Sequence, residues 1–183
     1  MYISRSLITL KGETEAKFVA RVEAAHSSRR IADGFRWAML LRSMDDPSTF
    51  ASMTMWLTPE HDAAWRAANA TPAPMHGYDV TTARGAMTPA AAVAIVGWQV
   101  EAADAARFAA GWNAAYHAIE DVFGSRLLQD LNAPSDFAGL HVVTDPAQLD
   151  PTVLSARLTD ADGLAIEPTA VERFDIVLLT EAP

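Results

Sequence analysis

Cysteine is absent from the 183 residues of the chain. This absence excludes disulfide bonds, iron–sulfur clusters, thiolate zinc sites and cysteine nucleophiles. Long apolar runs are missing as well: no stretch approaches the roughly 20 residues that cross a bilayer. The N-terminal segment MYISRSLITLKG also lacks the apolar core of a secretory signal. We therefore expect a soluble, cytoplasmic protein that has no membrane partner.

Basic residues are scarce, with 14 Lys and Arg against 23 Asp and Glu, for a net charge of -9. A nucleic-acid-binding protein needs a basic surface that displaces counterions from phosphate. The densest basic spot is Arg29-Arg30, which we expect to end a helix. The charge balance therefore argues against nucleic acid, and also against anionic membrane surfaces.

Common cofactor and metal motifs are missing too. The sequence has no G-x-S-x-G, no Walker motif and no dinucleotide-binding glycine pattern. Its five histidines show no paired spacing such as H-x-H or H-E-x-x-H. We predict no metal site and no bound cofactor. Hydrophobic residues make up 50% of the chain and charged residues 20%, which is typical of a globular protein.

An internal repeat is the strongest positive feature. Residues 39–59 (MLLRSMDDPSTFASMTMWLTP) align without gaps on residues 126–146 (RLLQDLNAPSDFAGLHVVTDP) and share L-L-x5-P-S-x-F-A. A second match pairs AKFVARVEAA at residues 16–25 with ARFAAGWNAA at residues 106–115. We interpret the chain as two diverged copies of one unit, 1–83 and 92–183, joined by a linker at 84–91.

Each copy contains the same order of expected elements. A strand and an amphipathic helix come first, then two strands joined by a turn, then a second helix and a closing strand. The strands of copy one are expected at 2–10, 35–43, 50–58 and 76–83, and those of copy two at 92–100, 125–131, 137–144 and 171–180. The order βαββαβ predicts an α+β fold of two ferredoxin-like repeats.

Such a sheet carries helices on one face only, so its other face must be covered. We expect the two antiparallel sheets to pack face to face as an α+β barrel within one chain. Because the fusion already supplies the partner sheet, we expect a monomer, or a homodimer joined through outer surfaces.

Strand parity assigns side chains to the two faces of the third strand, because alternate residues point to opposite sides. The continuously apolar set (Ala51, Met53, Met55 and Leu57) is expected under the helices. The mixed set (Phe50, Ser52, Thr54 and Trp56) is then expected to face the other sheet, joined from copy two by His141. Hydroxyls and an imidazole in an apolar enclosure indicate a ligand cavity, although the same groups could hydrogen-bond one another in an inter-sheet seam.

Other polar groups are expected to be exposed to solvent. Glu60-His61-Asp62 falls in the first turn of the helix that Thr58-Pro59 begins, where acids stabilise the helix dipole. His26 and His117 fall on the first helix of each copy, and we expect both imidazoles to be exposed.

The first copy resembles the antibiotic biosynthesis monooxygenase family of dimeric α+β barrels. The resemblance comprises Gly34-Phe35, LLRSMDDPSTF, Met55-Trp56, Trp65 and His76, and it spans residues 1–83. It implies a fold that encloses small aromatic or polyketide substrates, or haem, and a reaction with dioxygen that often needs neither metal nor flavin. The second copy lacks these tryptophans, with Val143 opposite Trp56.

The haem-degrading branch of that family offers a narrower comparison. The resemblance implies an Asn on the first strand, a Trp on the second helix, and a histidine that ligates iron. Trp65 and His76 occupy the last two places, but Arg5 stands in the Asn place and cannot reproduce its donor and acceptor pattern. Pro72 and Pro74 also interrupt the approach to His76. Haem breakdown is therefore the less favoured alternative, and we predict that these residues form no haem site.

Together these observations favour a cofactor-independent monooxygenase that acts on a small aromatic or polyketide-like ligand. The alternative is a non-catalytic ligand-binding or stress-response barrel. We expect the first copy to carry the site, because equivalent positions of the second hold Gly139 and Val143. The expected substrate-binding residues are Trp56, Trp65, Thr54 and Ser52, and the expected catalytic residues are His76, His141 and Arg5.

Overall fold

The structure is a computed structural model that describes residues 1–88, 90–117, 124–149 and 166–183. It divides into two compact units, one of residues 1–79 with 176–183 and one of residues 80–175.

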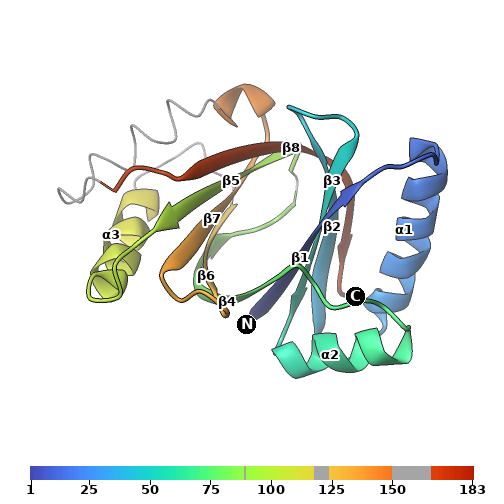
Figure 1. Ribbon diagram of the computed structural model, residues 1–183, viewed down its shortest axis with the longest axis horizontal. Helices are drawn as coiled ribbons and strands as arrows, with labels where there is room; N and C mark the ends of the chain where they lie inside the picture. The colour runs from blue at the N-terminus through green and yellow to red at the C-terminus, as the bar shows by residue number, and fades with distance from the viewer. Residues whose placement is uncertain (89, 118–123, 150–165) are drawn as a thin grey trace. The chain divides into compact units, whose positions relative to one another are not determined.

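The first unit contains the elements expected for copy one. These are β1 (Tyr2–Thr9), α1 (Glu15–Arg30), β2 (Phe35–Ser43), β3 (Thr49–Trp56), α2 (Pro59–Ala68) and β4 (His76–Gly85). The helix α2 begins at a proline that follows Thr58, as the sequence predicted. Figure 1 shows α1 running along one side of the strands β1, β2 and β3, with α2 across their end.

The second unit repeats this order with β5 (Ala92–Gln99), α3 (Ala105–His117), β6 (Gly124–Asp130), β7 (Asp136–Val143) and β8 (Ala170–Glu181). A four-residue 3₁₀ helix, Pro146–Leu149, follows β7, where the second helix of copy two is expected. The rest of the region expected to hold this helix, residues 150–165, lies outside the described residues.

Both units have the same strand order, which confirms the predicted fold class. The hydrogen-bonded sequence of strands is β1-β3-β2-β8-β5-β7-β6-β4, and it closes on itself. Within it, β4-β1-β3-β2 and β8-β5-β7-β6 are the same ferredoxin-like arrangement. The strands β4 and β8 each belong to both units, because the unit boundaries fall at 79/80 and 175/176. None of the described strands has an open edge in this order.

The assignment of the two faces of β3 was wrong. The ring of Phe50 lies 5.0 Å from that of Phe18 on α1, and Trp56 lies 6.2 Å from Trp65 on α2, so the mixed set faces the helices. Met53 and Met55 therefore project from the opposite face, where both are buried. The expectation was that helices need a uniformly apolar face beneath them. Here the helices instead cover a face on which two hydroxyl side chains lie between two aromatic ones.

Candidate functional site

A cavity of about 710 Å³ lies within the first unit, on the helix-covered side of its sheet. This volume is within the range of small-molecule sites, roughly 300–1,000 Å³. Its wall comes from β1, β3, α1, α2 and the segment between α2 and β4. The lining residues are Ser4, Ser6, Leu7, Ile8, Phe18, Arg21, Val22, Ala25, Arg29, Ser52, Thr54, Trp65, Arg66, Ala70, Thr71, Pro72, Ala73 and Met75.

Four hydroxyl groups form one floor of this cavity. The antiparallel pairing of β1 with β3 sets Ser4 opposite Thr54 and Ser6 opposite Ser52, and partners in register share a face. Ser4 Oγ is 3.5 Å from the carbonyl oxygen of Thr54. Within the described residues, the side chains of Ser6, Ser52 and Thr54 make no hydrogen bond. These three hydroxyls can therefore bind a polar group of a ligand.

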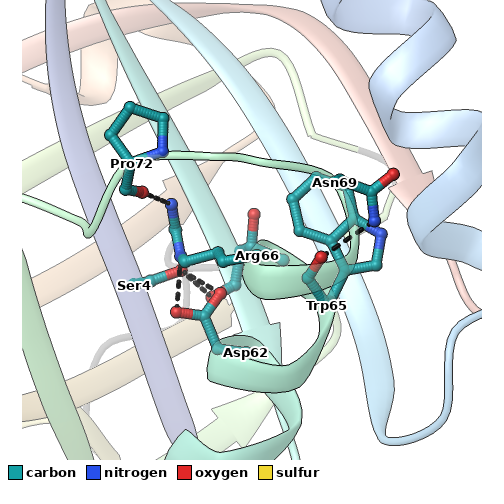
Figure 2. Close-up of polar contacts among 7 residues, drawn as sticks. Ser4, Asp62, Trp65, Arg66, Asn69 and Pro72 are labelled. Carbon is teal, nitrogen blue, oxygen red and sulfur yellow. Dashed lines mark hydrogen bonds and ion pairs between the residues drawn. The ribbon is translucent and has the colours of Figure 1, made fainter.

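A hydrogen-bonded cluster closes one end of the floor (Figure 2). Arg66 Nε donates to Asp62 Oδ2 at 2.7 Å, Arg66 Nη1 to the carbonyl oxygen of Pro72 at 2.5 Å, and Arg66 Nη2 to Ser4 Oγ at 3.2 Å. Ser4 Oγ in turn lies 3.4 Å from Asp62 Oδ1. The cluster ties α2 to β1 and holds the segment after α2 at the cavity wall.

Arg29 and two tryptophans form a stack at the other side of α2. The guanidinium of Arg29 lies 4.4 Å from the centre of the Trp65 ring, and Trp65 packs in turn against Trp56. Arg29 is only 8% exposed, and its Nη1 is buried without a hydrogen-bond partner among the described residues. Desolvation by burial, together with the nearby charge of Arg66, lowers the pKa of Arg29 to about 10. Arg29 therefore remains a cation at neutral pH.

The charge of the lining is of one sign. Arg21, Arg29 and Arg66 line the cavity, and no carboxylate or imidazole side chain does so among the described residues. Arg21 is paired with Glu13 and Arg66 with Asp62, both at 2.7 Å. Arg29 has no such partner within the part of the chain that the structure describes. The cavity therefore contains one buried positive charge that makes no ion pair among these residues, although the charge of Asp62 acts on it from a distance and raises its pKa.

The structure brings together some of the residues predicted for the site and separates others. Ser52, Thr54 and Trp65 line the cavity, and Trp56 lies fully buried behind Trp65. Arg5 pairs in register with His76 on β4. Because Arg5 lies between Ser4 and Ser6 on β1, both it and His76 belong to the face opposite the cavity.

His141 is placed in the second unit. It is fully buried on β7, with its ring centre 5.7 Å from that of Trp112 on α3, so it also faces a helix. Burial lowers the pKa of His141 to about 3, which keeps the imidazole neutral. The lining residues of the cavity all lie between 4 and 75, so the structure does not bring His141 together with Trp65 and Thr54.

Several buried polar residues were missed or misplaced in the sequence argument. Asp62 is 3% exposed, so the expected solvation of the α2 start is wrong for this residue. His26, expected to be exposed, is 1% exposed, and its Nδ1 is 3.3 Å from Thr180 Oγ1. The side chain of His117 lies outside the described residues. The steps from Phe18 to Val22, His26 and Arg29 are four, four and three, which place these residues on one helix face and could have indicated their burial.

Groups of three or more potential metal ligands are absent from the described residues. Among these residues there is also no helix whose length and hydrophobicity would let it span a bilayer.

Comparison with known proteins gives a family match for the N-terminal part of the chain. Residues 1–73 match the sequence profile of the antibiotic biosynthesis monooxygenase family, which confirms the resemblance noted above. No curated protein sequence matches the chain.

Solved structures share the whole fold at low sequence identity. A monooxygenase candidate from Fusobacterium nucleatum has a TM-score of 0.70 at 10% identity, over 98% of this chain and 94% of its own. An anthrone oxidase-like protein has a TM-score of 0.61 at 10% identity, over 99% and 93%. A heme-degrading enzyme from Listeria monocytogenes has a TM-score of 0.59 at 8% identity, over 96% and 99%. At such identities these likenesses establish the fold alone.

Proposed function

With residues 1–73 as an antibiotic biosynthesis monooxygenase domain, we propose that the protein is a cofactor-independent monooxygenase that oxidises a small aromatic or polyketide-like molecule. The observation that carries the proposal is the cavity of the first unit. It combines an apolar wall from α1 with a floor of hydroxyl groups from β1 and β3. A ligand site needs this combination of apolar surface and a few convergent polar groups.

Oxygenation without a cofactor restricts the substrate, which must itself supply every electron. A methylene group activated by neighbouring rings or carbonyls meets this requirement: R₂CH₂ + O₂ gives R₂C=O + H₂O. One oxygen atom becomes the new carbonyl and the other leaves as water. The reaction proceeds through loss of a proton from the methylene, so a site that stabilises the resulting anion lowers the barrier.

Different side chains of the cavity can contact the substrate ring and stabilise its anion. Phe18 and Val22 of α1 offer apolar contacts to a flat ring. The hydroxyls of Ser52 and Thr54 can donate to a substrate carbonyl oxygen and so delocalise the charge that develops there. The positive lining favours the ionised substrate over its neutral form. The catalytic roles expected for Arg5, His76 and His141 stay predictions, and this scheme does not use them.

A second candidate function is non-catalytic binding of the same class of ligand. It is favoured by one observation: the described lining contains no carboxylate or imidazole that could accept the methylene proton. In the monooxygenase scheme that proton passes to solvent. The two functions therefore differ in whether bound ligand is consumed together with dioxygen.

Anthrone, which has one activated methylene between two rings, is a suitable probe, because one of the similar structures is an anthrone oxidase-like protein. We expect the protein to accelerate formation of anthraquinone over spontaneous oxidation, with one O₂ consumed per product in an oxygen-electrode assay. Replacing Ser52 with Ala and Thr54 with Val together should lower kcat/KM by roughly 10- to 100-fold, because two oxyanion donors are lost.

Ser27→Ala is the matched control, since Ser27 is exposed on α1 and its hydroxyl donates to the backbone of Glu23. Binding of anthrone without oxygen uptake would favour the non-catalytic function. Neither binding nor turnover, or turnover that the double substitution leaves unchanged, would contradict the proposal for this cavity.

A further inference from the structure

Arg29 is the one lining arginine of the described cavity that makes no ion pair; Asp62 acts on it only from a distance. Arg21 and Arg66 are held by Glu13 and Asp62, at 2.7 Å in each case. Only 8% of Arg29 is exposed to solvent. Within the described residues its side chain nevertheless makes no ion pair and no hydrogen bond. A buried charge without a partner is costly, and proteins usually pair it or neutralise it.

Neutralisation does not occur here. The pKa of Arg29 is lowered only to about 10, by burial and by the charge of Arg66, so the guanidinium stays protonated at neutral pH. A hydrophobic residue of similar length at this position would pack on Trp65 without leaving a charge unpaired. The stability of the fold therefore does not account for a cation at this position. Binding of a ligand in the adjoining cavity does.

The position of the guanidinium indicates which ligand atoms can bind to it. The guanidinium carbon of Arg29 lies over the Trp65 ring, 4.4 Å from the ring centre. The donors of a guanidinium lie in its plane and point outward from its edge, so an anionic oxygen can bind them edge-on while the ring contact with Trp65 is kept. Cationic donors bind anionic oxygens most strongly, with bonds about twice as strong as neutral ones.

We propose that Arg29 is an anion-binding residue, and that the ligand of the cavity is a flat apolar molecule that carries an anionic oxygen on its ring system. The apolar wall of Phe18 and Val22 receives the rings, and Arg29 receives the oxygen. A carboxylate and an ionised phenol or enol share this chemistry. In a chain of net charge -9, a cavity whose lining has three arginines and no acid among the described residues selects for an anion. The inference rests on the proposed function in one respect, that this cavity is the ligand site.

Three probes separate the parts of this proposal: anthracene-2-carboxylate, its neutral analogue anthracene-2-carboxamide, and alizarin at a pH where its phenol is ionised. Binding is measured by fluorescence or absorbance titration on the full chain. We expect the wild-type protein to bind at least one of the two anions about ten-fold or more tightly than the carboxamide. The tighter anion identifies which source of anionic oxygen the site prefers.

Arg29→Met is expected to abolish this preference while leaving carboxamide affinity within about two-fold, because only the charge-assisted bonds are lost. The variant should fold and melt at a temperature no lower than the wild type, since it removes an unpaired buried charge. Arg30→Met is the matched control: it makes the same change at the exposed neighbouring position, outside the lining, and should keep the preference.

The outcomes distinguish the two claims. Equal affinity for the anions and the carboxamide in the wild type, or an anion preference that survives in Arg29→Met, would overturn the role of Arg29 and leave the cavity as a ligand site. If none of the three probes binds, both this inference and the proposed function lose their support.

Discussion

Replacing Trp65 with alanine is expected to lower the free energy of unfolding by about 3–5 kcal/mol, as for other large aromatic side chains removed from a core. Trp65 is 8% exposed and packs between the Trp56 ring, 6.2 Å away, and the guanidinium of Arg29. The substitution removes the ring from a cluster that also contains Tyr2, Phe35 and Ala38. Urea unfolding of the wild type and the variant measures the difference.

The same substitution is expected to weaken ligand binding, by about 1–3 kcal/mol for planar aromatic molecules if the ring is also a wall of the site. Trp65→Phe is the matched control, since it keeps an aromatic face under Arg29 and should keep most of the wild-type stability and ligand affinity. A stability loss below about 1 kcal/mol would contradict the packing described here. Unchanged affinity in a folded Trp65→Ala protein would remove Trp65 from the site.

Acidification is expected to produce the second large effect. Burial lowers the pKa of His26 to about 4, with a smaller contribution from Arg29, and lowers that of His141 to about 3. In the unfolded chain both imidazoles titrate near 6.5. Below that pH the unfolded state binds more protons than the folded state. The free energy of unfolding therefore falls as the pH falls from about 6.5 to about 3. The loss is on the order of 3 kcal/mol or more for each histidine.

Urea unfolding at pH 7, 5.5 and 4.5 tests this expectation. His141→Gln should reduce the slope of stability against pH in this window, whatever its effect at pH 7, because the variant has no imidazole to protonate. His76→Gln, at a position that is only partly buried, is the control and should keep the wild-type slope. A slope that is the same in all three proteins would show that His141 does not resist protonation in the fold.

The topology was predictable because it depends on features that repeat along the chain. The two runs that share L-L-x5-P-S-x-F-A form the equivalent hairpins β2–β3 and β6–β7. The order of helical and strand patterns around them predicts the same βαββαβ unit twice. The position of α2 was predictable for a local reason, since Pro59 after Thr58 is a helix start whatever surrounds it.

The faces of the strands were not predictable in the same way. Parity separates Phe50, Ser52, Thr54 and Trp56 from Met53 and Met55, but it does not say which set lies under the helices. The decision depends on tertiary contacts, here Phe18 against Phe50 and Trp65 against Trp56. This single inversion moved the expected site from the far face of the sheet to the helix side. It also separated Arg5 and His76 from Trp65.

The residue that defines the character of the cavity was missed for a related reason. Arg29 was interpreted as one of two basic residues at a helix end, where cations are usually solvated and favourable. Its burial follows from its position on the face of Phe18 and Val22, a pattern that is visible in the sequence but that a charged residue does not normally extend. Charged residues at such positions are candidates for ligand contacts.

The central claim is that the helix-side cavity of the first unit is the ligand site, and a crystal structure of the protein with anthracene-2-carboxylate tests it most directly. We predict electron density for the three rings against Phe18 and Val22, near the hydroxyls of Ser52 and Thr54, with the carboxylate within hydrogen-bond distance of Arg29. Density for the ligand at any other place, with this cavity empty, would contradict the account.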